Sequence, residues 1–191
     1  MFSEIAAGSD KVEAGVDKND WMNDKVRAGG VFTVECFDKD GNLKWKESSH
    51  NLVVNVGLQD MNDKYFDGSA YTATWYLGLV TGPGGSNTYA AGDTLGAHAG
   101  WTEFSSYTGN RKSVTWNGAT LADPSVMSNS SSASSFAITG SGTVAGAFLA
   151  SVDTGTSGIL FSVSNFQSPG DRTVANGDTL NVTYSFSLDA A

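Results

Sequence analysis

Strict alternation of apolar and polar residues near the end of the chain is the feature that most limits its fold. Within residues 179–188 every second residue is apolar, from Leu180 to Leu188, and the residues between them are Asn, Ser or Thr. Successive side chains of a strand point to opposite faces, so this pattern predicts a strand with one buried and one solvated face. The similar spacing of Ile159, Phe161 and Val163 predicts a neighbouring strand of the same kind.

Several other segments have the composition of strands. Residues 31–37 and 43–47 flank a turn that contains glycine, which predicts a β-hairpin. Residues 71–80 are rich in aromatic and branched side chains and predict a central strand. Turn-forming clusters separate further strand-like stretches at residues 112–116, 135–139, 143–152, 157–164 and 179–188.

One segment has helical rather than strand spacing. After the short apolar run that ends at Gly57, Leu58, Met61 and Tyr65 recur at helical intervals up to the stop at Asp67 and Gly68. We therefore expect a mainly β protein: an antiparallel β-sandwich or jelly-roll-like domain over residues 31–191, with one short helix. The sequence contains no repeat of 20–50 residues, which would be typical of a propeller or a solenoid.

Residues 1–30 differ from the rest in charge. The first 67 residues hold 13 Asp and Glu and 8 Lys and Arg, whereas residues 68–191 hold only 7 and 3. A polar segment with few large apolar residues does not bury enough surface to fold alone. We expect an extended N-terminal arm that either is disordered or is ordered against a partner through its scattered apolar residues, Val12, Val16, Trp21, Met22 and Val26.

Composition disfavours several partners and compartments. The net charge of −9 and the pI near 4.4 argue against nucleic acid, whose phosphates require clustered Lys and Arg. No stretch approaches the length of a spanning helix, and the first residues lack the pattern of a signal peptide, so we expect a soluble chain with no membrane partner. Cys36 is the only cysteine, which excludes an internal disulfide and predicts a buried side chain.

The residues that carry catalysis or bind metals are sparse. His50 and His98 are the only histidines, and no Gly-x-Ser-x-Gly turn is present, so the sequence predicts neither a metal site nor a serine hydrolase. Asp38 begins a spacing that resembles a calcium-binding loop, but the sixth and twelfth positions lack the glycine and the glutamate that this loop requires. The acidic residues that a glycan hydrolase would require all lie in turns, at Asp153, Asp171 and Asp178. We predict no enzyme activity, no cofactor and no metal.

Residues 86–109 have little periodicity and predict a long surface loop. Long ordered loops are often functional. Within this loop, Trp101 is the best candidate for an exposed ring that stacks on a sugar, with His98 beside it. This pair defines an alternative ligand-facing site for a glycan.

Four segments resemble small accessory virion proteins of tailed bacteriophages. They are VECFDKDGNLKW at residues 34–45, NLVVNVGL at 51–58, TWYLGLV at 74–80, and GDRTV followed by GDTLNVTY at 170–184. The likeness covers roughly residues 31–188. The absence of a heptad or repeat stretch argues against a fibre shaft.

The resemblance implies a non-enzymatic structural protein of the virion. The first hypothesis is a decoration or cement protein on the exterior of the capsid, made in the bacterial host cytoplasm. Its partners would be the major capsid protein and copies of itself, with the arm reaching across capsomer boundaries. The second hypothesis is a receptor- or glycan-binding module at the tail that uses His98 and Trp101. A glycan hydrolase is a third alternative.

Overall fold

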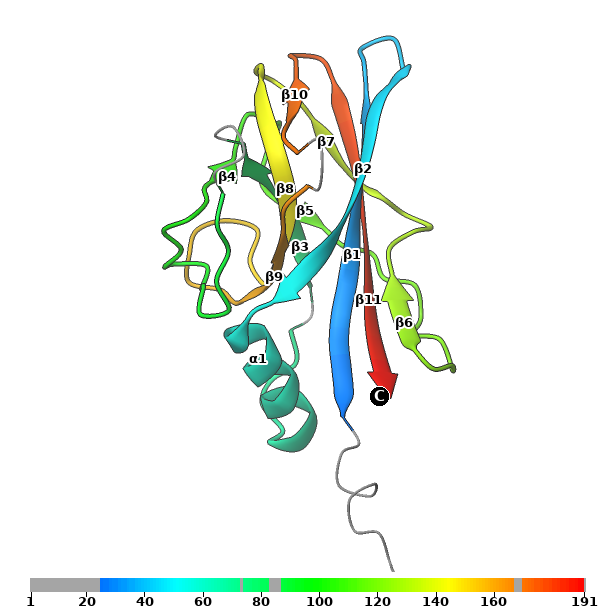
Figure 1. Ribbon diagram of the computed structural model, residues 1–191, viewed down its shortest axis with the longest axis vertical. Helices are drawn as coiled ribbons and strands as arrows, with labels where there is room; N and C mark the ends of the chain where they lie inside the picture. The colour runs from blue at the N-terminus through cyan, green and yellow to red at the C-terminus, as the bar shows by residue number, and fades with distance from the viewer. Residues whose placement is uncertain (1–24, 73, 83–86, 167–169, 191) are drawn as a thin grey trace, which may run out of the picture.

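The fold is mainly β, as predicted from the sequence (Figure 1). The computed structural model describes residues 25–72, 74–82, 87–166 and 170–190. Its elements are β1 (Val26–Phe37), β2 (Leu43–Val53), α1 (Asn55–Phe66), β3 (Tyr76–Thr81), β4 (Glu103–Phe104), β5 (Lys112–Ser113), β6 (Ser125–Ser128), β7 (Ser134–Ala137), β8 (Gly142–Ala150), β9 (Leu160–Ser164), β10 (Arg172–Val174) and β11 (Thr179–Ala190).

All the strands of the described residues belong to one 11-stranded antiparallel sheet. Its main order is β4-β3-β8-β9-β2-β1-β11-β6, while β10 pairs with β8, β5 with β3 and β7 with β11. β2 joins the two halves of this order. Its first part pairs with β1 up to His50, and its last three residues pair with β9. One long strand therefore connects the β1 and β11 region to the β3 and β8 region.

The predicted hairpin is confirmed by the antiparallel pairing of β1 and β2. Its turn is held by the Asp38 carboxylate, which accepts hydrogen bonds from the backbone N–H groups of Asp40 and Asn42 at 2.9 and 2.8 Å. Gly41 has a φ of +84°, a left-handed conformation that favours glycine. The local sequence therefore determines this turn.

β1 begins at Val26, five residues before the predicted start of the β domain. Residues 26–30 pair with residues 186–190 of β11, so this part of the predicted arm belongs to the sheet. The extra strand length has a simple reason, since backbone pairing with β11 does not require large side chains at Gly29 and Gly30. The other predicted arm contacts, Val12, Val16, Trp21 and Met22, lie outside the described residues.

The alternation in β11 produces the predicted burial. Leu180, Val182 and Tyr184 have no exposed surface, and Tyr184 stacks on Phe32 of β1 with ring centroids 4.3 Å apart. The Tyr184 hydroxyl accepts from the Asn51 amide of β2 at 2.8 Å and from the Ser162 hydroxyl of β9 at 3.3 Å. Tyr184 thus ties together strands from both halves of the sheet order.

β9 departs from the predicted pattern, because all five of its residues are buried. Both faces of β9 pack against core side chains, and a bulge also changes which residues share a face: Leu149 pairs with Ser162 and Ala150 with Leu160, so Phe161 is an extra residue in the ladder. The bulge interrupts the simple alternation of faces. Phe161 joins the larger core cluster, while Leu160 and Val163 join the smaller one.

The predicted helix is confirmed as α1, which ends at Phe66 before Asp67 and Gly68. Its buried residues include Gly57, where an added Cβ would lie 2.5 Å from the carbonyl oxygen of Phe161. Only glycine therefore allows the helix to approach β9 this closely. The opposite end of α1 carries Tyr65 and Phe66, which are largely exposed.

The remaining strands differ from prediction mainly in their bounds. β3 begins at Tyr76 rather than at residue 71, and β5 is only two residues long. The short strands β4, β6 and β10 were not predicted, since segments of two to four residues carry too little periodicity. In the loop predicted at 86–109, β4 and a bridge between Thr94 and Ala97 are present.

Candidate functional site: an apolar groove beside the start of β1

A groove of about 830 Å³ lies between α1 and the sheet, at the end where β1 begins and β11 ends. In Figure 1 this end is at the bottom, and the turn between β1 and β2 lies at the opposite end. Its wall is formed by α1, β1, β6, β8, β9 and β11, together with the loops before β3 and after β5. Its volume is that of a small-molecule or peptide site.

The floor of the groove consists of large side chains that also belong to the core. Phe161 contacts Trp75 and Phe186 edge to face, with both pairs of ring centroids 5.4 Å apart. Trp116 contacts Tyr184 with centroids 6.2 Å apart. Since the core holds these rings, the floor is rigid and already formed in the free protein.

The rim is apolar and exposed. Tyr65 and Phe66 at the end of α1 are 83% and 80% exposed, Tyr71 is 79% exposed, and Val26 at the start of β1 is 72% exposed. Tyr65 and Phe66 lie edge to face with centroids 4.8 Å apart. A contiguous apolar surface of this kind is typical of an interaction site.

The charged groups of the groove are already paired. Lys64 forms an ion pair with Asp60 one turn earlier in α1 at 3.0 Å and donates to the carbonyl oxygen of Ala70 at 2.7 Å. These contacts hold the segment after α1 against the helix. The groove therefore offers apolar surface for binding, and its paired charges offer no free acid or base.

The groove contains one residue that the sequence predicts as a binding contact of the arm, Val26. Sequence reasoning missed the rest because they come from segments far apart in the chain. One signal was present: Tyr65 and Phe66 are adjacent in a helix, and adjacent positions do not share one face. Two neighbouring aromatic residues at the end of a helix therefore indicate that at least one lies outside the core.

The predicted ligand-facing loop is not an exposed aromatic platform. Trp101 is only 3% exposed, and its Nε1 donates to the Asp93 carboxylate at 3.1 Å. Its ring packs on Phe148 at 5.3 Å and stacks against His98 at 3.7 Å between centroids. The predicted exposure of Trp101 is wrong because the indole fills the smaller core cluster, and the half-buried His98 ring covers it.

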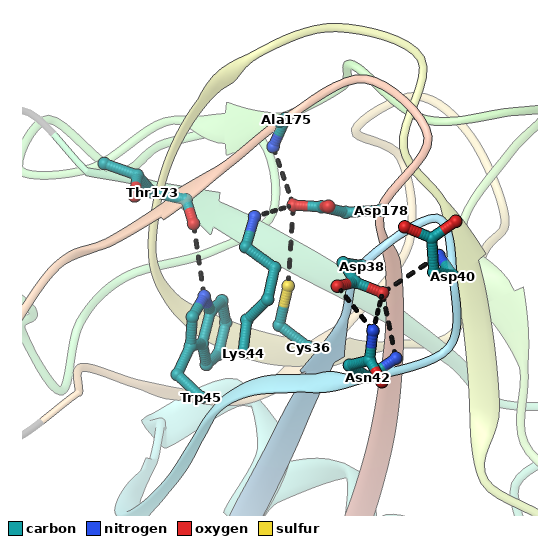
Figure 2. Close-up of polar contacts among 9 residues, drawn as sticks. All are labelled: Cys36, Asp38, Asp40, Asn42, Lys44, Trp45, Thr173, Ala175 and Asp178. Atoms are coloured by element: carbon teal, nitrogen blue, oxygen red, sulfur yellow. Dashed lines mark hydrogen bonds and ion pairs between the residues drawn. The ribbon is translucent and has the colours of Figure 1, made fainter.

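Apart from the groove, a polar cluster around Asp178 joins the turn before β11 to the β1–β2 hairpin. Figure 2 shows Cys36 and Lys44 directed at Asp178, which lies in the turn before β11. Lys44 Nζ lies 2.5 Å from Asp178 Oδ2, the thiol of Cys36 donates to the same oxygen at 3.7 Å, and the backbone N–H of Ala175 donates to it at 2.8 Å. Asp178 is thus a turn carboxylate, as predicted, with additional partners on the hairpin.

The polar cluster around Asp178 stabilises the fold and contains no reactive nucleophile. Burial, and then the charge of Asp178, raise the pKa of the Cys36 thiol from 9.0 to about 12. A thiol with this pKa is protonated at neutral pH and is a poor nucleophile. The predicted burial of Cys36 is confirmed, and the hydrogen bond from Lys44 to Asp178 raises the pKa of Lys44, which keeps the ammonium charged.

The carboxylate of Asp38 is also occupied by protein donors. The backbone N–H of Asn42, followed by its side-chain amide, lowers the pKa of Asp38 below its ordinary value. Figure 2 shows these bonds within the turn between β1 and β2. Across the described parts of the chain, no group of three or more His, Cys, Asp and Glu side chains is placed to hold a metal ion.

Comparisons with known proteins add no relative: no protein-family model, no curated protein and no solved structure matches this chain. Within the described residues, α1 is the single α-helix, and no helix has the length and apolar character that a membrane span requires. The apolar groove beside β1 is therefore the best candidate for a functional site on structural grounds alone.

Proposed function

We propose that this chain is a non-enzymatic structural protein of a tailed-bacteriophage virion, a decoration protein on the exterior of the capsid. Its partners are the major capsid protein and copies of itself. The observation that carries the proposal is the apolar groove, whose rim presents Tyr65, Phe66, Tyr71 and Val26 to solvent over a rigid aromatic floor. Such a surface suits the binding of an apolar protein segment.

The sequence supports the assignment to a virion. The resemblance to accessory virion proteins includes residues 51–58, which contain the first turn of α1, and residues 177–184, which begin β11. The symmetry of a capsid repeats each contact many times, so a groove of modest affinity is sufficient for collective reinforcement of the shell. The net charge of −9 also favours a protein partner over nucleic acid.

We further propose that the two halves of the sheet order face each other as a β-sandwich. The contacts of Tyr184 in β11 with Ser162 in β9, and of Phe186 with Phe161, support this arrangement, because they join strands that are not neighbours in the sheet. In a sandwich the groove is the open end of the space between the two layers, which explains why core side chains form its floor.

The test is cosedimentation with capsids that lack the protein, scored by the number of copies bound. Wild-type protein is expected to bind saturably at many copies, and the double variant Tyr65→Ser, Phe66→Ser is expected to lose most of this binding. The matched control is Leu121→Ser, which removes a fully exposed apolar side chain outside the groove. Undiminished binding of the double variant would refute the role of the groove.

The same experiment with isolated tails tests the second hypothesis. A tail-associated receptor- or glycan-binding module would bind tails at a few copies and leave capsids unoccupied. The burial of Trp101 removes the exposed ring on which that hypothesis was based. Binding only to tails would therefore contradict the decoration proposal and direct attention to the exposed aromatic residues of the groove as a tail-binding surface.

A further inference from the structure

We propose that the edge of β1 at residues 26–30 pairs with the same edge of a second copy, so that two chains form a symmetric dimer through one continuous sheet. β1 pairs with β11 along residues 26–37, but it pairs with β2 only from Val31 onward. Beyond His50, β2 leaves β1 and pairs with β9, as Figure 1 shows. Among the described residues, no strand therefore pairs with the second edge of β1 at residues 26–30.

The backbone groups of Val26, Ala28 and Gly30 point to this free edge. In an antiparallel ladder, consecutive residues of a strand direct their N–H and C=O groups alternately to one neighbour and to the other. The N–H of Ala190 in β11 donates to the carboxylate of Asp123, just before β6, at 3.1 Å and thus points away from β1. Val26 lies opposite Ala190 and therefore directs its own groups away from β11. By alternation, Ala28 and Gly30 have the same direction.

Two other contacts agree with this direction of the backbone groups. Phe32 of β1 lies opposite Tyr184, whose N–H donates at 2.7 Å to Asn129 Oδ1, just after β6. Tyr184 thus also points away from β1, six residues before Ala190. The carbonyl oxygen of Gly29 accepts from the Ser187 hydroxyl of β11 at 3.4 Å. Gly29 therefore faces β11, and the residues on either side of it face the free edge.

This edge is complementary to itself. When two copies lie antiparallel with Ala28 opposite Ala28 of the second copy, Val26 lies opposite Gly30. Each outward N–H and C=O group of the three residues then faces a partner, because all three belong to the same phase of the ladder. Val26 is 72% exposed, and its side chain gains cover opposite a residue that has none. No proline or bulge protects the edge against such pairing.

The charges near the edge oppose the dimer only weakly. Arg27 lies opposite Gly29 of the second copy, so no like charges lie directly opposite each other. The two Arg27 side chains are diagonal neighbours on one face, and Asp189 of β11 lies opposite each of them in its own chain. Salt screens the repulsion between the arginines and between two copies of net charge −9, so the dimer should strengthen as salt concentration rises.

The contact deepens one part of the proposed function, the association of the chain with copies of itself, and it requires no capsid. Val26 also lines the groove, so the dimer holds two grooves on one continuous sheet. If the proposed function is correct, each dimer offers two grooves to the shell, which increases its avidity.

Sedimentation velocity of the full chain tests the proposal. We expect wild type to dimerise at submillimolar concentration. Ala28→Pro removes an outward N–H without removing a bond to β11, and Ala28→Lys places two like charges directly opposite each other. Each variant should weaken dimerisation at least about tenfold. Ala28→Ser is the matched control, because it keeps the N–H and nearly the size of alanine, and it should dimerise as wild type does.

Three results would overturn the proposal: a monomeric wild type at submillimolar concentration, an undiminished dimer of either folded variant, or an equal loss in Ala28→Ser. Circular dichroism establishes that the variants fold, and if one does not fold, the other decides. A monomeric wild type would refute the edge contact and leave capsid binding through the groove open. Failure to bind capsids would instead refute the proposed function and leave the dimer intact.

Cross-linking provides a second measurement that locates the contact. In a hydrogen-bonded antiparallel pair the Cα atoms lie about 5.5 Å apart, which a disulfide can span. Ala28→Cys should therefore form a covalent dimer under mild oxidation at least about tenfold faster than Leu121→Cys, a fully exposed position in the loop before β6. The native Cys36 is buried and does not compete. Equal rates would show that the two copies of Ala28 are not neighbours.

Discussion

The ammonium group of Lys44 in β2 lies 2.5 Å from a carboxylate oxygen of Asp178, in the turn before β11, although the two residues are 134 positions apart. The side chain of Asp178 is only 5% exposed and that of Lys44 is 32% exposed. The ion pair therefore anchors the hairpin to the turn that begins the last strand. It satisfies a carboxylate that would be costly to bury alone.

We expect Lys44→Met to lower the free energy of unfolding by about 2 kcal/mol, because Asp178 loses a charged donor while it stays buried. The measurement is urea unfolding at pH 7. Lys46→Met is the matched control on the same strand, since Lys46 forms an exposed pair with Glu35 at 2.9 Å and should cost less than about 1 kcal/mol. Equal losses in the two variants would contradict the structural role of the Lys44 contact.

Stability should fall at alkaline pH partly because of Cys36. The unfolded thiol loses its proton near its ordinary pKa of 9.0, whereas the folded thiol keeps it until about 12. The unfolded state then binds fewer protons, so the free energy of unfolding decreases as pH rises above 9. From pH 9 to 10 this group accounts for a loss of about 1 kcal/mol.

The check is urea unfolding of wild type and Cys36→Ala under reducing conditions at pH 8, 9 and 10. The buried tyrosines, whose pKa values are also raised, and Lys44 affect both proteins, so the comparison isolates the thiol. We expect the decrease from pH 9 to 10 to be about 1 kcal/mol smaller in the variant. Parallel curves would show that the thiol does not keep its proton in the folded state.

Trp101→Ala should destabilise the fold instead of removing an exposed binding surface. The substitution removes a buried ring and its hydrogen bond to Asp93, with an expected loss of about 3–5 kcal/mol in the free energy of unfolding. Chemical denaturation measures this loss. Full stability of the variant would mean that the indole is exposed in solution and would restore the loop as a ligand-facing surface.

Gly57→Ala should be destabilising although alanine is the better helix former by about 1 kcal/mol. The added Cβ would lie 2.5 Å from the carbonyl oxygen of Phe161, so α1 must move away from β9. We expect a net loss of about 1–3 kcal/mol by thermal or urea unfolding. Gly118→Ala is the control, because no atom lies within 4 Å of a Cβ at that position, and its stability should change by less than about 0.5 kcal/mol.

Local patterns in the sequence determined the class of fold and several of its elements. The alternation in β11, the Asp38 turn with Gly41, and the helical spacing of Leu58, Met61 and Tyr65 each depend on interactions between residues close in the chain. Such interactions leave a regular signal at period 2 or 3.6. The burial of Cys36 follows in the same way from its place in an apolar strand.

Only the tertiary structure decided the features that depend on contacts between distant segments. The bulge at Phe161, the burial of Trp101 and the pairing of Lys44 with Asp178 depend on which strands become neighbours, and sequence periodicity carries no information on that choice. The groove is the clearest case. Val26, Phe66, Trp75 and Phe186 come from four separate segments, and they form one surface because α1 and the end of β11 stand apart at the end of the sheet where β1 begins.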